Sequence, residues 1–285
     1  MIDGIGAFPI EPLKGRFDGK TMVITGGTSG IGRATVIRAA AEGGNVVFGG
    51  RNLERGQQVL DEVKAVGGKA IFVPGDLRDI KNVKELYARA EKEFGEIHIA
   101  VNNAGIIGPA NAIYEVDAPE FIEVIENNLY TMFYCCKEAF EYMDKTGKGG
   151  SIVNVASIAG RAGMPLGVAY CSSKHAVNGM TKAIAMDGAV KGIRCNSINP
   201  AGSSTPLNDA TSDYYRAKFT RLAKEGVDVQ EYTANTLGLA KVCPPLYKRP
   251  SVPEEQAAAI LFLASNDSRH ITGAIVATDG GFTAY

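Results

Sequence analysis

The chain has 285 residues, of which 45% are hydrophobic and 21% are charged, as in ordinary soluble globular proteins. This length can bury a full hydrophobic core without disulfides or structural metals. The 30 basic residues nearly balance the 31 acidic ones, and the resulting net charge of −1 excludes a general electrostatic attraction to nucleic acid or to an anionic membrane. We therefore expect neither as a partner.

Short β-branched segments alternate with longer amphipathic segments along nearly the whole chain, a pattern typical of a parallel sheet with helices on both faces. The expected strands are Thr21–Thr25, Asn45–Phe48, Ala70–Val73, Ile97–Asn102, Ser151–Ala156, Arg194–Ile198 and Ala274–Thr278. The expected helices are Ile31–Glu42, Leu53–Val66, Ile80–Phe94, Pro119–Met143, Ala169–Val190 and Pro253–Ala264. We predict an α/β fold: residues 18–285 form a single doubly wound, Rossmann-type domain with a seven-stranded parallel sheet, preceded by an N-terminal extension at residues 1–17.

One segment interrupts this alternation after the sixth expected strand. Residues 201 to 250 contain four prolines and several aromatic residues, and are helical only in part. We predict that residues 206–250 form a helical substrate lid over a pocket at the carboxyl ends of the strands. The alternative is a partly helical surface excursion that packs on the core.

The cysteines and histidines show no spacing typical of metal ligands, so no metal site is predicted. We interpret the five cysteines as small apolar residues, with a reactive thiol at Cys171 as the alternative. The first 20 residues lack a basic region followed by a long apolar run, and no 18-residue apolar window occurs. The sequence therefore predicts a reducing, cytoplasmic location. The cysteines are Cys135, Cys136, Cys171, Cys195 and Cys243, and the histidines His98, His175 and His270.

A glycine-rich turn, Thr25–Gly32, joins the first expected strand to the first expected helix. Its bare backbone N–H groups and the positive end of the helix suit a phosphate, whereas the alternative is a tight structural turn. Two more segments follow strands at the same edge of the sheet: Asp76, as an acceptor for an adenine amino group, and Asn102–Gly105, whose small residues allow close approach of a ligand. Each of these two segments is also compatible with turn chemistry alone.

Tyr170 and Lys174 are four residues apart and share one helix face. A free tyrosine has a pKa of about 10, and a nearby ammonium favours the phenolate, which makes Tyr170 a usable acid or base. The same spacing recurs at Tyr214 and Lys218. Ser157, at the end of an apolar strand, distinguishes the first pair because its hydroxyl can donate to a substrate oxygen.

These residues form an ordered set that resembles the short-chain dehydrogenase/reductase family over residues 18 to 283. The set comprises Thr25-Gly26-x-x-x-Gly30-x-Gly32, Asn102-Asn103-Ala104-Gly105, Asn128, Ser157 and Tyr170-x-x-x-Lys174. The resemblance implies that Tyr170 exchanges a proton with the substrate oxygen while hydride moves between the substrate carbon and nicotinamide C4. It also implies that Ser157 holds that oxygen and that Lys174 lowers the pKa of Tyr170 and binds the nicotinamide ribose.

The resemblance also assigns a role to an asparagine of the fourth expected helix. Asn128, rather than its neighbour Asn127, corresponds to the family asparagine that holds a water linking the lysine to solvent. A structural role in the helix is the alternative. The family has Pro-Gly after the sixth strand, where this chain has Pro200-Ala201-Gly202, and Thr205 still follows at the spacing needed to reach the nicotinamide carboxamide.

The end of the second expected strand bears on the choice of cofactor. NAD-binding relatives generally carry a carboxylate there, whereas this chain has Gly49-Gly50-Arg51-Asn52. Arg51 can bind a 2′-phosphate, so NADP(H) is favoured over NAD(H), although Ser29 stands where many NADP-specific relatives carry a second basic residue. The alternative for Arg51 is a solvated turn residue. The expected cofactor-binding residues are Gly26, Thr28, Ser29, Gly30, Ile31, Arg51, Asp76, Leu77, Asn103, Ala104, Gly105, Tyr170, Lys174, Pro200 and Thr205.

The predicted function is an NADP(H)-dependent oxidoreductase that interconverts a secondary alcohol and a ketone. The apolar residues Met164–Val168 before Tyr170 indicate a hydrophobic, cyclic or steroid-like substrate, while Arg161 either binds an acidic group or lies at the surface. The alternatives are an epimerase or double-bond reductase of the same fold, and a non-catalytic dinucleotide-binding regulator. Family members are often tetramers built on the fourth and fifth long helices, so we expect a homotetramer or a homodimer.

Overall fold

The computed structural model describes residues 11–233 and 249–284. Residues 1–10 of the predicted extension, residues 234–248 of the predicted lid with Cys243, and Tyr285 lie outside the described residues. In chain order the principal elements are β1 (Thr21–Thr25), α1 (Gly30–Ala41), β2 (Asn45–Gly50), α2 (Leu53–Ala65), β3 (Lys69–Pro74), α3 (Ile80–Phe94), β4 (Ile99–Asn102), α4 (Ala118–Ile125), α5 (Thr131–Thr146), β5 (Gly150–Val155), α6 (Val168–Ala189), β6 (Ile193–Pro200), α7 (Pro206–Lys224), α9 (Pro253–Ala264) and β7 (Ile275–Thr278).

The strands form one seven-stranded parallel sheet, as predicted, and the structure gives their order as β3-β2-β1-β4-β5-β6-β7. Ile24 of β1 pairs with Phe48 of β2 on one side and with Val101 of β4 on the other. The chain therefore winds outward from β1 to β3 and then returns to the centre at β4. At such a reversal the loops that follow the two central strands diverge, and ligands bind in the crevice between them.

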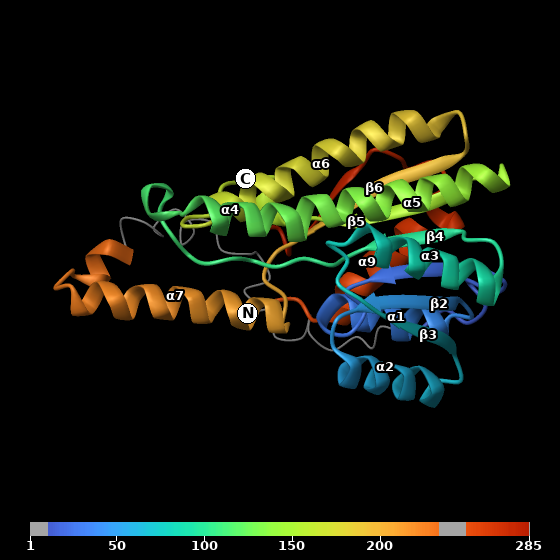
Figure 1. The fold of residues 1–285 in the computed structure, drawn as a ribbon, viewed down its shortest axis with the longest axis horizontal. Coiled ribbons are helices and arrows are strands. Elements are labelled where there is room, and N and C mark those ends of the chain that lie inside the picture. The colour runs from blue at the N-terminus through green and yellow to red at the C-terminus, as the bar shows by residue number, and fades with distance from the viewer. Residues whose placement is uncertain (1–10, 234–248, 285) are drawn as a thin grey trace.

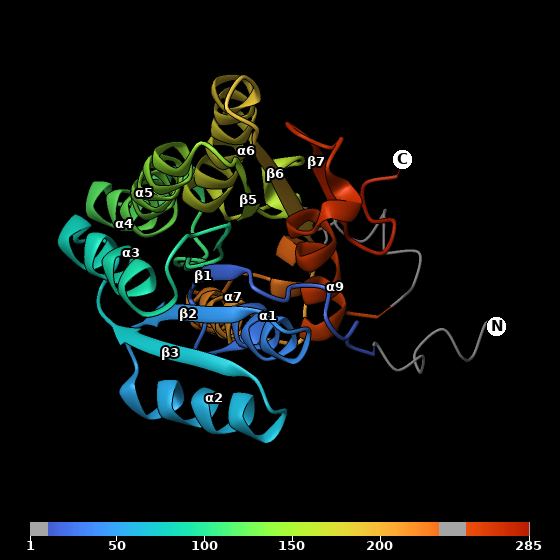
Figure 2. The ribbon, with the colours of Figure 1, turned by 90° about the vertical axis from the view of Figure 1, so that its right-hand side faces the viewer.

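Helices cover both faces of the sheet (Figure 2). One face packs against α3, α5 and α6 and has a core that includes Leu86, Cys135 and Val177. The other face lies against α1, α2 and α9, with Val36 and Ile260 in its core. The central strands β1 and β4 are buried along their whole length, and each carries a continuous apolar run rather than an alternating one.

The predicted helix Pro119–Met143 is not regular. It is divided into α4 and α5 by a π-helical turn, η2 (Glu126–Tyr130), that contains Asn127 and Asn128. The hydroxyl of Thr131 donates to the backbone oxygen of Glu126 at 3.1 Å, across this turn. A π turn widens the helix locally, often at functional sites. No break in the sequence, such as a proline or glycine, marks this turn.

The segment after β6 carries the long helix α7, whose start agrees with local sequence preferences. Thr205 is the N-cap, with its hydroxyl accepting from the backbone N–H of Asn208 at 3.3 Å, and Pro206 occupies the first helical position. Figure 1 shows α7 extending away from the carboxyl end of the sheet. This part of the predicted lid is helical.

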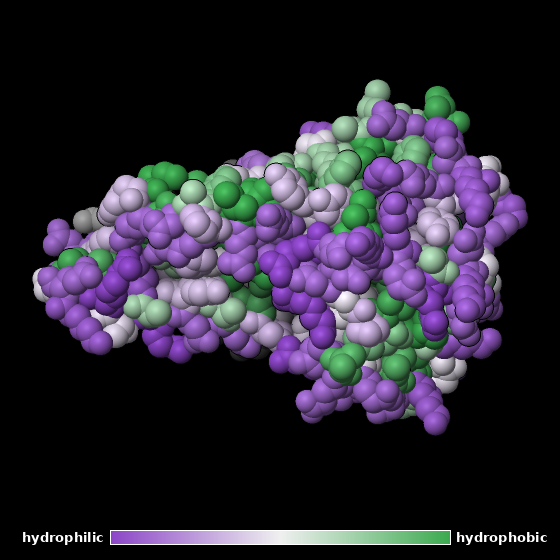
Figure 3. Space-filling model, in the orientation of Figure 1, coloured by the Kyte–Doolittle hydropathy of each residue, from purple (hydrophilic) through white to green (hydrophobic). Residues whose placement is uncertain are grey.

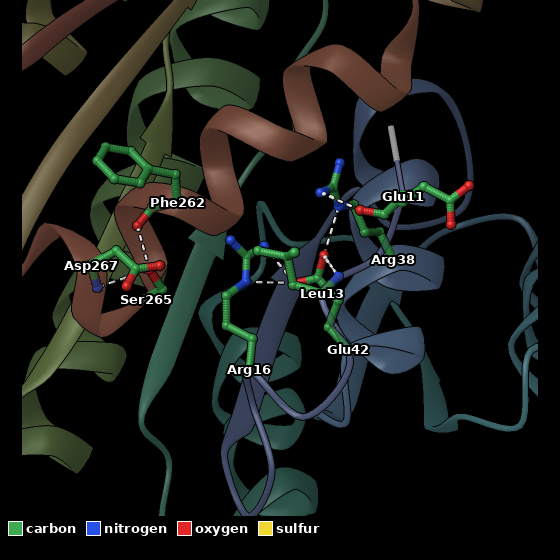
Figure 4. Close-up of polar contacts among 8 residues, drawn as sticks. All are labelled: Glu11, Leu13, Arg16, Arg38, Glu42, Phe262, Ser265 and Asp267. Atoms are coloured by element: carbon green, nitrogen blue, oxygen red, sulfur yellow. Dashed lines mark hydrogen bonds and ion pairs between the residues drawn. The ribbon is translucent and has the colours of Figure 1, made fainter. Parts of the chain in front are cut away.

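Residues 11–17 pack against the end of α1 around one carboxylate (Figure 4). Glu42, which is fully buried, accepts hydrogen bonds from the backbone N–H of Leu13 at 3.2 Å, from Arg16 Nε at 2.7 Å and from Arg38 Nε at 2.8 Å. Phe17 lies in the core beside α1 and β1. This part of the chain therefore contributes to folding of the domain.

The molecular surface seen in Figure 3 is largely hydrophilic, with small apolar patches between the polar areas. Over residues 11–233 and 249–284, no helix combines the length and the apolar character needed to cross a bilayer.

Candidate active site

The glycine turn after β1 is tightly packed, both within itself and against Asn103. Gly26 has φ +64°, and a Cβ there would lie 2.8 Å from Asn103 Nδ2. A Cβ on Gly32 would lie 2.2 Å from the backbone oxygen of Gly26. Both contacts are shorter than real side chains tolerate, so only glycine fits these positions, and the backbone itself forms the floor of the site.

The start of α1 presents free backbone donors to the same place. Ser29 is the N-cap, but its side chain makes no capping hydrogen bond, and the first turn contains no acidic residue. Ser29, Gly30 and Ile31 line the cleft described next. Uncapped N–H groups at the positive end of a helix bind anions, so this turn fits the phosphates of a dinucleotide.

A cleft of about 280 Å³ follows the carboxyl ends of β1, β2, β3 and β4. It is joined to a second pocket of about 170 Å³ beyond the end of β5, because Ile31, Asn103, Gly105 and Thr205 line both. All fifteen residues predicted to bind the cofactor lie in one or the other. The cleft is lined by Gly26, Thr28, Ser29, Gly30, Ile31, Arg51, Asp76, Leu77, Asn103, Ala104, Gly105 and Thr205, and the second pocket also by Tyr170, Lys174 and Pro200.

Asn103 fixes the spacing between the two central strands at the cleft. Its backbone N–H donates to Thr25 Oγ1 at 3.0 Å, and its side-chain amide donates to the backbone oxygens of Thr25 and Gly26 at 3.1 and 3.2 Å. The glycine turn is therefore held by the loop after β4. This side chain positions the site rather than offering its amide to a ligand.

Asp76 lies in the cleft, but its carboxylate already has a partner. Arg78 donates to it from the backbone N–H at 3.0 Å and from the guanidinium, which lowers the pKa of Asp76. The carboxylate is therefore charged at neutral pH. An adenine amino group bound there would share this acceptor with Arg78.

A second arginine lines the cleft with Arg51 and was not among the predicted cofactor-binding residues. Arg55, in the first turn of α2, lines the cleft together with Arg51 and Asn52. Asn52 caps α2 by accepting from the backbone N–H of Arg55 at 2.8 Å. The four-residue spacing of the two arginines across a helix start was the available signal.

The second pocket is lined by three of the four residues predicted to be catalytic, and the fourth, Asn128, is described below. Ser157 follows β5 as the N-cap of a short 3-10 turn, with its hydroxyl accepting from the N–H of Ala159 at 3.1 Å. Tyr170 and Lys174 lie in the first turns of α6, and both side chains are buried. Strand β5 and helix α6 thus bring together residues that are separated along the chain.

Burial dominates the ionisation of Tyr170 and Lys174. It raises the pKa of Tyr170 to about 12, against an opposing effect of the hydrogen bond from Ser157. It lowers the pKa of Lys174 to about 8. The net effect is that the pKa of Tyr170 is raised rather than lowered. The ammonium of Lys174 donates to the backbone oxygen of Val155 at 3.0 Å, and the expected lowering of the Tyr170 pKa by Lys174 stays a prediction.

Asn128 is fully buried in the π turn and connects three parts of the site. Its side chain accepts from the N–H of Ile106 at 2.7 Å and donates to Ile106 O at 2.9 Å and to Ser173 Oγ at 3.1 Å. A Cβ on Gly105 would lie 2.9 Å from Asn128 Oδ1 and 3.6 Å from Lys174 Nζ, so Gly105 lies close to both side chains. Asn127 donates to Glu123 O instead.

Three other candidates lie outside this arrangement. Lys218, four residues after Tyr214, binds the carboxylate of Glu115. Burial raises the pKa of the Cys171 thiol, which opposes the reactive thiolate considered as an alternative. Arg161 is exposed, which agrees with the alternative that it lies at the surface.

Comparison with known proteins agrees with this geometry. A family model described as short chain dehydrogenase matches residues 20–215. The chain belongs to the short-chain dehydrogenase/reductase family. It is an NAD(P)-dependent alcohol dehydrogenase/ketoreductase of that family.

Members of the short-chain dehydrogenase/reductase family resemble the chain over nearly its full length. A 3beta-hydroxysteroid dehydrogenase of Mediterraneibacter gnavus is 47% identical, covering 96% of this chain and 98% of the relative. A cyclohexanol dehydrogenase of an Acinetobacter species is 35% identical, covering 95% and 98%. Among solved structures, levodione reductase superposes with a TM-score of 0.83 at 29% identity, covering 94% of this chain and 100% of that one.

Proposed function

We propose that this enzyme interconverts a hydrophobic, cyclic secondary alcohol and its ketone, with Tyr170 as the acid/base and NADP(H) as the preferred cofactor. The observation that carries the proposal is that Ser157, Tyr170 and Lys174 line one small pocket that opens into the dinucleotide cleft. When bound, the nicotinamide dinucleotide supplies or accepts the hydride.

The preference for NADP(H) rests on charge at one end of the cleft. No carboxylate follows β2, and Arg51 and Arg55 both line the cleft where a ribose would lie. Guanidinium groups form strong, charge-assisted hydrogen bonds with phosphate. Two arginines therefore favour a 2′-phosphate over the free hydroxyl of NAD.

Proton transfer is assigned to Tyr170. Because the pKa of Tyr170 is about 12, its phenol keeps the proton at neutral pH and can donate it to the oxygen of a ketone. Ser157, whose hydroxyl is hydrogen-bonded to the phenol, is placed to donate to the same substrate oxygen as negative charge develops on it. The charge on Lys174 favours the phenolate that forms.

A hydrophobic, cyclic substrate is supported by the pocket and by the relatives. Apolar side chains surround Ser157 and Tyr170 on several sides, and two relatives are named for a cyclohexanol and a hydroxysteroid. Such a lining favours a ring without charges. The apolar residues are Ile107, Val155, Ile158, Met164 and Leu207.

A spectrophotometric screen tests the proposal. The absorbance of the reduced nicotinamide is followed with cyclic ketones, cyclic alcohols and cyclic enones, each with NADPH or NADH. We expect turnover of ketones and alcohols, with a larger kcat/KM for NADPH than for NADH. Reduction of the carbon–carbon double bond alone, or cofactor binding without any turnover, would contradict the assignment.

We also propose that the enzyme is a homo-oligomer built on α5 and α6. Phe133 on α5, Met186 on α6 and Val190 directly after α6 are exposed, with 49%, 78% and 91% of their surfaces accessible in the monomer. Exposed apolar side chains on long helices suit a subunit interface. Size-exclusion chromatography with light scattering should give a dimer or tetramer, and a monomer at micromolar concentration would contradict this.

A further inference from the structure

Helix α7 forms one wall of the substrate pocket. Leu207, Asn208 and Thr211, in its first two turns, line the pocket with Ser157 and Tyr170. The shape of the pocket therefore depends on where α7 lies. The contacts that hold α7 in place come from its later turns, beyond the pocket.

The strongest of these contacts is an ion pair between segments 103 residues apart. The ammonium of Lys218, which is only 5% exposed, binds both carboxylate oxygens of Glu115 in the loop between β4 and α4. Arg221 Nη2 donates to the same carboxylate at 3.0 Å. Glu115 is itself fixed, because it accepts from the backbone N–H of Ala112 at 2.9 Å. We call Glu115, Lys218 and Arg221 the Glu115 anchor.

This anchor differs from an ordinary surface ion pair. Exposed pairs contribute little to stability because water screens them and their side chains lose entropy. A buried ammonium that loses its carboxylate is left without a counter-charge, which is strongly unfavourable. Displacing α7 would therefore expose Lys218 or leave it unpaired, so the anchor favours the position in which α7 lines the pocket.

A second contact ties the same helix to the segment before α6. The hydroxyl of Tyr215 donates to the backbone oxygen of Pro165 at 2.6 Å. Pro165 lies in the segment that leads into α6 and that also carries Met164, a pocket residue. Helix α7 is thus tied both to the loop after β4 and to the loop before α6.

With α7 held in this way, the pocket is small. Its volume is about 170 Å³, whereas pockets for drug-sized ligands have about 300–1,000 Å³. Beyond Met164, the space between α7 and the loop at Gly108 is only about 10 Å³, bounded by Leu166 and Tyr214. A polycyclic ketone, being larger, would therefore require more outward movement of α7 than a single ring.

We infer that Glu115 is a specificity-determining positioning residue: by holding Lys218 it keeps α7 against the pocket, and so favours single-ring ketones over polycyclic ones. This inference rests on the proposed alcohol/ketone activity. Releasing the anchor should weaken binding of a single-ring ketone, because that ketone loses contact with α7. It should also allow a polycyclic ketone to enter the pocket. The measurable consequence is a change in selectivity rather than a uniform loss of activity.

The test compares kcat/KM for cyclohexanone and for a 3-ketosteroid in the parent enzyme and in two variants, Glu115→Gln and Lys218→Met. We expect the ratio of the two values to shift toward the steroid by about tenfold in both, the range that pocket fit alone usually gives, chiefly through a higher KM for cyclohexanone. Asp213→Asn is the matched control, because it removes an exposed ion pair with Arg216 on the same helix. An unchanged ratio in both variants would overturn the inference.

Two further measurements separate the anchor from other effects. The double variant Glu115→Gln/Lys218→Met leaves no unpaired buried charge, and it should show the same shift in selectivity if either single variant folds poorly. If the parent turns over no ketone at all, the proposed function fails, and the anchor is tested by hydrogen exchange instead. Amide exchange in α7 should then be faster in Glu115→Gln than in the parent and in Asp213→Asn, and equal rates would overturn the inference.

Discussion

The ammonium of Lys174 lies 5.6 Å from the centre of the Tyr170 ring, one turn further along α6. Both side chains are buried, at 4% and 6% exposure, and burial moves their pKa values apart, lowering that of Lys174 to about 8 and raising that of Tyr170 to about 12. The phenol of Tyr170 is therefore protonated at neutral pH, and Lys174 is still charged although its burial disfavours the charge. The site thus holds an acid next to a cation, and the buried charge lowers the folding stability.

Lys174→Met should therefore raise the thermal stability of the cofactor-free protein at pH 7 while it removes turnover. The pKa of Lys174 is lowered from 10.5 to about 8 in the folded chain. Below pH 8 Lys174 is protonated in both the folded and the unfolded chain, and this shift then corresponds to a destabilisation of the fold by about 3 kcal/mol. Between pH 8 and 10.5 the unfolded chain binds the extra proton, so the stability of the parent rises with pH. Thermal unfolding should thus show a larger gain at pH 7 than at pH 10, and equal differences would contradict this account.

Arg51→Ala should weaken binding of NADPH by about tenfold or more and leave NADH nearly unaffected, since a hydrogen bond between charged groups contributes about 1.5–3 kcal/mol. Arg55→Ala should act in the same direction, because its side chain lines the same cleft. Arg89→Ala, an exposed position on α3, is the control. Fluorescence titration with both cofactors measures the effect, and equal losses for NADPH and NADH would refute the role of Arg51.

Glu42→Gln should lower the free energy of unfolding by about 3–5 kcal/mol, because the buried carboxylate is the shared acceptor for Arg16 and Arg38 (Figure 4). Glu62→Gln is the matched control. Its partner Arg33 is a surface arginine, so the loss there should stay within about 1 kcal/mol. Urea unfolding of the two variants checks the difference, and similar small losses in both would show that residues 11–17 are not anchored by Glu42.

Much of the fold and the composition of the site could be predicted from the sequence. Apolar runs such as Met22–Ile24 are continuous because the strands are buried on both faces. Once the strands are known to be parallel, their carboxyl ends share one edge. Residues that directly follow strands, such as Gly26, Asn103 and Ser157, must then gather there.

Contacts that depend on the packing of distant segments could not be predicted. The π turn around Asn128 is accompanied by hydrogen bonds to the backbone of Ile106, which no local pattern reveals. Lys218 and Glu115 are 103 residues apart, and each looks like an ordinary surface charge in the sequence. The rise in the pKa of Tyr170 could not be predicted either, because its burial is a property of the folded chain.

The central claim is that Tyr170 exchanges the proton with the substrate oxygen, and Tyr170→Phe tests it most directly. The change removes one hydroxyl from a buried ring and leaves the dinucleotide cleft intact. Tyr142→Phe is the control, because Tyr142 stacks on Tyr87 away from both pockets. We expect kcat for a cyclic ketone to fall by about a hundredfold or more in Tyr170→Phe, with the Kd for NADPH nearly unchanged. Turnover within a few fold of the parent would contradict the account.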